Sequence, residues 1–225
     1  MNLKLMGLIG IIITISACTK QLPDPSSNAS CLTNAATQAA RSKELKKLFE
    51  ADIHDRDNWE KMSRKQLEMM RMRDQVRRIR VSEIFAEGCF KTSDDYAEAA
   101  LIYQHGEDPD HFYQAFIWSN RAVALGDKDQ KQMVALTIDR YLVSIGKKQL
   151  FGSQAFASPA TNWCYCMSQV EPTFPDSMRQ DYLKKSLKSE YAEIAAMNKG
   201  KNICIHLECS DKLKSSPKGS VPGFW

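Results

Sequence analysis

Residues 92–126, TSDDYAEAALIYQHGEDPDHFYQAFIWSNRAVALG, decide the fold class of this 225-residue chain. Thr92 is followed by carboxylates, which is typical of a helix start because these side chains satisfy the free N–H groups of the first turn. Two apolar stripes at helical spacing follow, and Pro109 separates them. Gly126 ends the second stripe, since glycine tolerates the left-handed turn after a helix. The stretch therefore predicts two consecutive helices.

The same spacing extends in both directions from this stretch. An apolar stripe over 45–53 precedes it, another over 134–145 ends at Gly146, and a last pattern covers 178–196. Only a short piece around 203–207 suggests a strand. The sequence therefore predicts an all-α fold, an irregular bundle of about five to seven helices with a disulfide-stapled C-terminal segment.

Residues 61–80 predict a further helix with two different faces. Met62, Met69 and Val76 are seven residues apart, Met72 and Ile79 form the neighbouring row, and the opposite face is rich in Lys and Arg. We expect the methionines in the core and the basic face in solvent. The alternative is that the basic face meets anionic headgroups or an acidic partner.

The N-terminus predicts export. Lys4 precedes an apolar run over 5–15, which is shorter than the roughly 20 residues of a membrane-spanning helix. Residues 15–18, ISAC, resemble the lipobox of bacterial lipoproteins, which implies cleavage before Cys18 and its acylation. Residue 19 is a threonine and not an aspartate. By the same resemblance, this implies that the protein is anchored in the outer membrane with its body facing the periplasm. An ordinary signal cleaved near Ala17 is the alternative.

These signals divide the chain into four parts. We expect a signal peptide over 1–17, the lipidated cysteine and a flexible tether rich in Pro, Ser and Asn over 18–32, a helical domain over 33–209, and an irregular tail over 210–225. A hydrophobic content of 43% and a charged content of 26% are ordinary for a globular domain. The net charge of +4 is mild, and with export it excludes nucleic acid as a partner.

Six cysteines remain beside Cys18, namely Cys31, Cys89, Cys164, Cys166, Cys204 and Cys209. An even number in an oxidising compartment favours disulfides. Cys164 and Cys166 are too close in sequence to pair without strain, so each is expected to reach the 204/209 pair, in an order that stays open. Cys31 and Cys89 pair by elimination. A four-cysteine zinc site is the alternative, but its spacing is poor, and we expect no metal and no cofactor.

Four short motifs stand out in the middle of the chain: DIHDR at 52–56, QH at 104–105, DRYL at 139–142 and GKKQLFGSQ at 146–154. Their order resembles a bacterial family known as a domain of unknown function, with the pattern QH…DRxL…GxxQx[YF]G[ST]Q. The resemblance covers roughly residues 43–190 and implies a helical domain with no established reaction. Residues 113–127 are similar to one unit of a Sel1-like helical repeat, of which only one copy is visible.

The polar residues of these motifs are candidates for a pocket: Asp55, Arg56, Gln104, His105, Asp139, Arg140, Gln149 and Gln154. In one interpretation they line a site for an anionic or peptide-like ligand, because Arg and Gln offer directed hydrogen bonds. In another they form a structural network, with Asp139 or Asp55 on an arginine and the glutamines on a loop backbone. In a third, His105 is a general base held by Asp139.

No motif of a standard hydrolase or nucleotide-binding protein occurs in the sequence. His105 and His111 are six residues apart, which is not a same-face spacing for a metal. The sequence therefore favours a binding or interaction module tied to a membrane by its lipid, with a protein partner or a small anionic ligand. The alternatives are an immunity or inhibitor lipoprotein against an envelope-directed toxin, and an unfamiliar enzyme that uses His105 with Asp139 or Arg140.

Overall fold

The computed structural model describes residues 31–210 and 212–224. The expected signal peptide, Cys18 and nearly all of the expected tether lie outside these residues. Among the described residues, no helix combines the length and apolar character that a bilayer crossing requires.

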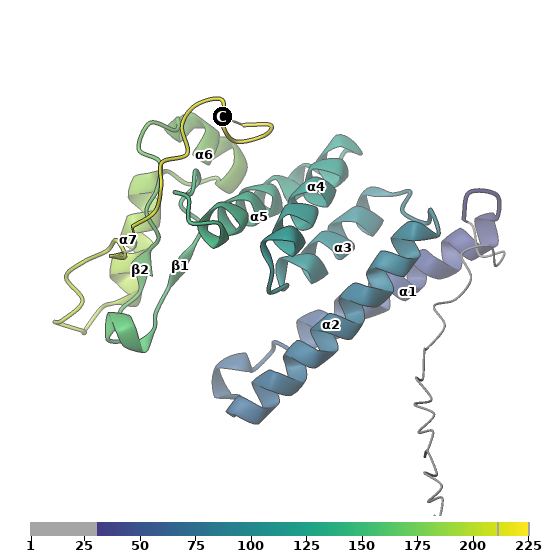
Figure 1. The fold of residues 1–225 in the computed structure, drawn as a ribbon, viewed down its shortest axis with the longest axis horizontal. Coiled ribbons are helices and arrows are strands. Elements are labelled where there is room, and N and C mark those ends of the chain that lie inside the picture. The colour runs from purple at the N-terminus through teal and green to yellow at the C-terminus, as the bar shows by residue number, and fades with distance from the viewer. Residues whose placement is uncertain (1–30, 211, 225) are drawn as a thin grey trace, which may run out of the picture.

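Seven α-helices form the described part of the protein, so the predicted all-α class is confirmed (Figure 1). The helices are α1 (Ala35–His54), α2 (Arg64–Ala86), α3 (Ser93–Gln104), α4 (Pro109–Ala124), α5 (Lys131–Ser144), α6 (Asp176–Leu183) and α7 (Leu187–Met197). Short 3-10 turns are η1 (Trp59–Lys61), η2 (Lys128–Gln130) and η3 (Pro159–Thr161). The strands β1 (Ala155–Phe156) and β2 (Cys166–Met167) pair antiparallel, Ala155 with Met167 and Phe156 with Cys166.

The expected helix boundaries of the central stretch are present. Thr92 accepts a hydrogen bond from the Asp95 N–H at 3.2 Å, and the Asp95 carboxylate accepts from the Thr92 N–H at 2.9 Å. Pro109 is the first residue of α4. The expected strand around 203–207 is absent among the described residues; instead, the Met167 N–H donates to the Leu207 carbonyl at 2.8 Å.

The described residues have two large hydrophobic clusters and a third, small one around Met167. The first joins α1, α2, α3 and α4 around Leu45, Ile84 and Trp118. The second joins α4, α5 and α6 around Ile138, Phe151 and Val221. Val221 belongs to the predicted irregular tail and is only 3% exposed. The described part of the tail contains no helix or strand element, and it is packed against the core.

α2 differs in part from the expectation. Met72 and Val76 are 63% and 67% exposed, so the prediction of core methionines is wrong. The basic face is divided: Arg77 and Arg78 are each 6% exposed, whereas Lys65, Arg71 and Arg73 are exposed to solvent as predicted. Arg77 is buried because α1 presents Asp52 and neighbouring acidic groups to α2, so that it is paired when buried.

Three disulfides join the six described cysteines: Cys31–Cys89, Cys164–Cys204 and Cys166–Cys209. The expected pairing scheme is confirmed, and the order that the sequence left open is settled. The first disulfide ties the chain before α1 to the chain after α2, and the other two tie the β2 region to the segment after α7. These bonds use the thiols that the four-cysteine zinc alternative would require.

Candidate functional site

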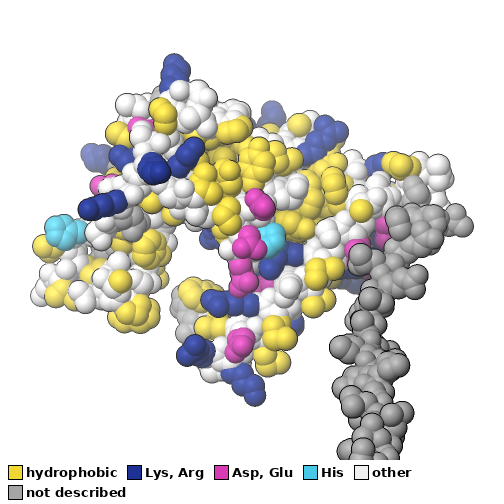
Figure 2. All heavy atoms as spheres, in the orientation of Figure 1, with side chains coloured by type: hydrophobic (Ala, Val, Ile, Leu, Met, Phe, Trp, Pro, Cys, Tyr) yellow, Lys and Arg dark blue, Asp and Glu magenta, His cyan; other side chains and the backbone are white. Residues whose placement is uncertain are grey.

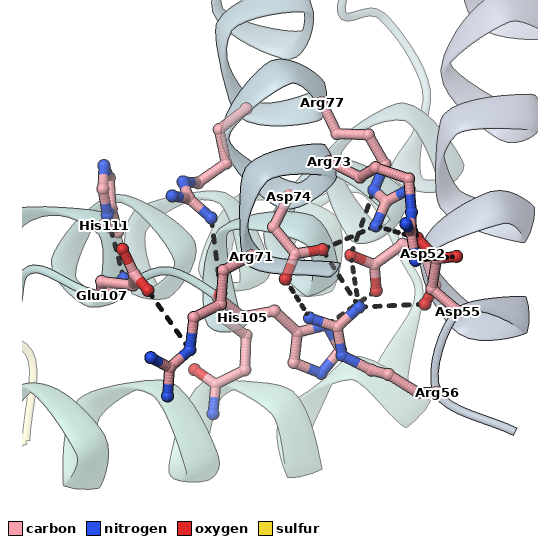
Figure 3. Close-up of polar contacts among 12 residues, drawn as sticks. Asp52, Asp55, Arg56, Arg71, Arg73, Asp74, Arg77, His105, Glu107 and His111 are labelled. Atoms are coloured by element: carbon pink, nitrogen blue, oxygen red, sulfur yellow. Dashed lines mark hydrogen bonds and ion pairs between the residues drawn. The ribbon is translucent and has the colours of Figure 1, made fainter. Parts of the chain in front are cut away.

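The C-terminal end of α3 is the centre of a polar network (Figure 3). His105 follows the last residue of α3, and its Nδ1 lies 2.7 Å from Oδ2 of Asp52 on α1. The Asp52 side chain is fully buried, whereas a quarter of the His105 side chain is exposed. A carboxylate at Nδ1 favours the tautomer with its proton there, which leaves Nε2 free to accept a hydrogen bond.

Arginines surround the buried Asp52 carboxylate. Nη1 of Arg56 lies 3.1 Å from Oδ1 of Asp52, and Nε of Arg77 lies 3.6 Å from the same oxygen. Arg56 also binds Asp74 through both terminal nitrogens, at 2.7 and 3.2 Å. In Figure 3 the carboxylates of α1 and the arginines of α2 point toward one another. The cluster therefore fastens the end of α1 to the middle of α2.

Asp55 lies at the outer edge of this cluster. It accepts two hydrogen bonds from Arg73, at 2.8 and 2.9 Å, and one from Arg77 at 2.6 Å. Partial burial raises the pKa of Asp55, but the hydrogen bonds from the two arginines outweigh burial and hold the pKa below its ordinary value. Asp55 is therefore a carboxylate neutralised within the chain.

Two further arginines bind the C-terminal carbonyls of α3. Nη1 of Arg140 donates to the Gln104 carbonyl at 2.6 Å, and Nη1 of Arg78 donates to the His105 carbonyl at 3.4 Å. Both cations lie at the negative end of the helix dipole, where they are stabilised. Among the described residues, no carboxylate lies within 4.0 Å of Arg140. Burial and the neighbouring Arg56 lower the pKa of Arg140.

The junction of Arg140, Gln104 and His105 has unused hydrogen-bonding groups. Gln104 is 5% exposed, and its buried Oε1 has no hydrogen-bond partner in the described part of the chain. Nε of Arg140 donates to Oε1 of Gln154 at 3.2 Å, and its Nη2 makes no hydrogen bond with a described residue. A guanidinium edge without a carboxylate, beside an unfilled amide acceptor, is suited to a small ligand with both an anionic oxygen and a donor.

Asp139 and Gln149 hold the loop between α5 and β1. The Asp139 carboxylate accepts from the N–H groups of Leu150, Phe151 and Ser153 at 2.8–3.2 Å. Burial raises the pKa of Asp139, and these hydrogen bonds oppose the shift. Nε2 of Gln149 donates to the carbonyls of Gln154 and Ser168, at 3.0 and 2.7 Å. Both side chains are fully buried, so they have a structural role.

The structure thus divides the eight candidates into two groups. Arg56, Gln104, His105, Arg140 and Gln154 meet at the junction, with Asp55 at the edge of the ionic cluster. Asp139 and Gln149 belong to the loop, which Gln154 links to the junction because its N–H donates to Oε1 of Gln149 at 2.8 Å.

One expectation about the aspartates is corrected here, and one open alternative is decided. Asp139 does not hold His105, because its oxygens are used by the loop; Asp52 takes that place. Asp139 does not bind an arginine either, whereas Asp55 does. Asp52 and Asp74 were not among the candidates. The sequence feature that could have identified Asp52 is its position four residues before Arg56, because that spacing is typical of an ion pair on a helix.

A partly enclosed cavity lies elsewhere and has a volume of about 260 Å³. Its walls include Leu136 of α5, Ser153, Tyr165, and Glu190 and Met197 of α7, and none of the eight candidates. Burial raises the pKa of Glu190. On the face drawn in Figure 2, a histidine and several acidic side chains gather instead near the turn between α3 and α4.

A metal site finds little support among the described residues. Cys31, Glu87 and Cys89 lie close enough together to share an ion, but the two cysteines are joined by a disulfide. Nδ1 of His111 accepts from the N–H groups of Glu107 and Asp108, both at 3.3 Å, so it stabilises the start of α4.

Comparison of the chain with known proteins finds no matching family model, no matching curated protein and no matching solved structure. The resemblance stated for the motifs at 52–56, 104–105 and 139–154 therefore stays a prediction.

Proposed function

We propose that the chain is an exported, lipid-anchored protein of the bacterial cell envelope that binds a partner rather than converting a substrate. The observation that carries the proposal is that all six described cysteines are in disulfides. Disulfides of this kind persist in oxidising compartments and are rare in the cytosol. The apolar run, Cys18 and the tether-like composition of 18–32 support the same location.

The anchor is tested by the mass and the location of the mature protein in the producing bacterium. We expect the protein in the membrane fraction, with Cys18 as its first residue and fatty acids attached. The Cys18→Ala variant should keep its signal segment and incorporate no labelled fatty acid, whereas Ser27→Ala, in the same tether, should behave as the wild type. A wild-type protein released in soluble form without lipid would contradict the proposal.

The binding role is supported by the unused groups at the junction. Arg140 offers a guanidinium edge without a carboxylate, and Gln104 offers a buried acceptor. We propose a small anionic ligand here, and the probes are phosphate, acetate and a short peptide with a free carboxylate. One of them should raise the melting temperature of the wild type but not of Arg140→Gln, with Arg121→Gln on α4 as the control. No shift with any probe would contradict this site.

The enzymatic alternative keeps His105 but now with Asp52 as its partner. The 2.7 Å contact between Nδ1 and the buried carboxylate is the observation that favours it. If His105 acts as a base, His105→Gln should abolish a turnover that the wild type shows; if the contact is structural, the same change should lower only stability.

A further inference from the structure

The solvent face of α2 carries a narrow apolar row, here called the α2 stripe: Met69, Met72, Val76 and Ile79. Their exposed fractions are 50, 63, 67 and 53%. The intervals of three, four and three residues are those of the a and d positions of a coiled coil. α2 lies at the outer edge of the unit formed by α1, α2 and α3 (Figure 1), and the exposed fractions show that the row is accessible among the described residues.

The width of the α2 stripe fits another helix better than a membrane. Glu68 and Gln75 border it on one side, and both are exposed. Arg73 and Arg80 border it on the other side. Arg73 forms an ion pair with Asp55, just after α1, and Arg80 forms one with Glu44 on α1. A helix that lies in a membrane interface needs a broad apolar face, whereas a two-helix seam needs only this single row. An open groove of about 410 Å³ runs along the stripe and can receive side chains.

Opposite charges close the two ends of the stripe. Lys65 and Glu83 continue the same a/d spacing, one at each end, and are the first charged residues on that row. Lys65 is exposed and has no ion pair among the described residues. The Glu83 side chain is 43% exposed and binds Arg80 at 2.7 Å through Oε2, and Lys65 of a second copy would be an additional partner. The positions of the row are therefore symmetric about residue 74, and the two residues at its ends carry opposite charges.

We infer that a second copy of this chain docks on the α2 stripe in antiparallel orientation. In that arrangement Lys65 faces Glu83 of the second copy, Met69 faces Ile79, and Met72 faces Val76. Each contact occurs twice, because a two-fold axis relates the copies and the same patch is used by both. The apolar row is then covered, and each Lys65, which has no ion pair among the described residues, gains a carboxylate partner.

A parallel copy fits less well. It would place Lys65 against Lys65 and Glu83 against Glu83, which is repulsive at both ends of the seam. Its one gain, Glu68 against Arg73, is small because both carboxylate oxygens of Asp55 already bind Arg73. The antiparallel copy brings the two Arg73 side chains near each other, but each is hydrogen-bonded to an Asp55 carboxylate, which lessens the repulsion.

Cysteine cross-linking in the cell envelope tests the orientation with the full chain. The six described cysteines are already paired, so an added cysteine reports on the seam. Two differently tagged copies, one Met72→Cys and one Val76→Cys, should form a disulfide-linked heterodimer. Met72→Cys with itself should cross-link much less. The inference would be overturned if Met72→Cys linked mainly to itself, or if neither combination of variants formed a cross-link.

Charge exchange tests the pairing independently, by sedimentation of the purified mature chain. Lys65→Glu alone and Glu83→Lys alone should each weaken dimer formation by about fivefold. The double variant Lys65→Glu/Glu83→Lys should restore it, because the charges remain opposite. Met72→Asp should give a monomer, whereas Ile205→Asp, at an exposed apolar residue far along the chain, should not.

A wild type that stays monomeric at every concentration, a double variant that fails to recover, or a Met72→Cys chain that links only to a different protein would overturn the inference. These outcomes leave the lipid anchor untouched, because the anchor is tested at Cys18.

Discussion

Asp139 fixes the loop after α5 with a single buried carboxylate. Three backbone N–H groups and the Ser153 hydroxyl donate to it, and it is fully buried. In Asp139→Ala the N–H groups would lose their acceptor without access to water. We expect a loss of about 3 kcal/mol or more in unfolding free energy, measured by urea denaturation. Asp57→Ala, at an exposed residue, should cost far less; equal losses would contradict the structural role.

Glu98 on α3 is a half-buried carboxyl with an altered proton affinity. Burial, with Asp94 and Asp95 nearby, raises its pKa from 4.5 to about 7. The folded state therefore binds more protons than the unfolded state between these values, so Glu98 lowers stability as pH rises through that window. Glu98→Gln should be more stable at pH 8 by about 1–2 kcal/mol, allowing for solvent screening, with little gain at pH 4. A gain that is equal at both pH values would contradict the shift.

Gly106 allows α4 to start close against α3. A Cβ at this position would collide with the Cβ and ring of His111, although the backbone itself is not left-handed. Gly146 is the comparison position. Its φ is +74°, and no atom lies within 4 Å of the position that a Cβ would take. We expect Gly106→Ala to lower the melting temperature more than Gly146→Ala, whose cost is about 1 kcal/mol of backbone strain. The reverse order would contradict this description of the turn.

The sequence predicted which polar residues lie in the network in most cases, but it did not predict which residues they contact. Gln149 and Gln154 were expected to serve a loop backbone, and Gln149 does. His105 was assigned the wrong aspartate, because Asp52 and Asp139 are both far from it in sequence and only the packing of α1 against α3 decides between them.

Helix α2 is the element for which hydrophobic periodicity predicted the wrong buried face. Its apolar row and its basic row have equally regular spacing, and an apolar row is normally expected to be the buried one. The choice depends on the partner surface. Glu44 and Asp52 lie on α1 and Asp55 follows it, so Arg77 and Arg80 turn toward these carboxylates, while Arg71 stays exposed. By contrast, the boundaries of α3 and α4 depend on local caps and on Pro109, and these could be predicted.

The ionic cluster between α1 and α2 gives a test of this inversion. Asp52→Ala would leave Arg56 and Arg77 with one buried carboxylate fewer, and it would also free His105. We expect a loss of about 3 kcal/mol in unfolding free energy, since removing one partner of a buried ion pair is strongly destabilising. Glu107→Ala, which removes an exposed ion pair with Arg71, should change stability by less than about 1 kcal/mol. A small effect of Asp52→Ala would mean that the cluster does not hold α2.

At the scale of the whole molecule, the disulfides act on two separate parts. Cys31–Cys89 closes the α1–α2 pair, whereas Cys164–Cys204 and Cys166–Cys209 hold a region with a small apolar cluster around Met167, Val170 and Ile194. The sequence predicted this division from cysteine spacing, because neither CxC cysteine can pair with its neighbour. It could not predict that the tail packs on the second core, since residues 210–225 have no periodic pattern.

Because the disulfides hold separate parts, we expect that loss of one disulfide destabilises only the part that it joins. The Cys166–Cys209 bond joins residues 43 apart in sequence, so Cys166→Ala/Cys209→Ala should lower stability by about 4 kcal/mol through unfolded-state entropy. Amide hydrogen exchange should quicken in β2 and in residues 198–209, where the Cys209 N–H donates to the Met167 carbonyl at 2.8 Å. The amides of α1 and α3, which the first cluster and the Cys31–Cys89 bond hold, should keep their protection. If those amides exchanged faster as well, the two parts would unfold as one unit, and the local role of the C-terminal disulfides would be wrong.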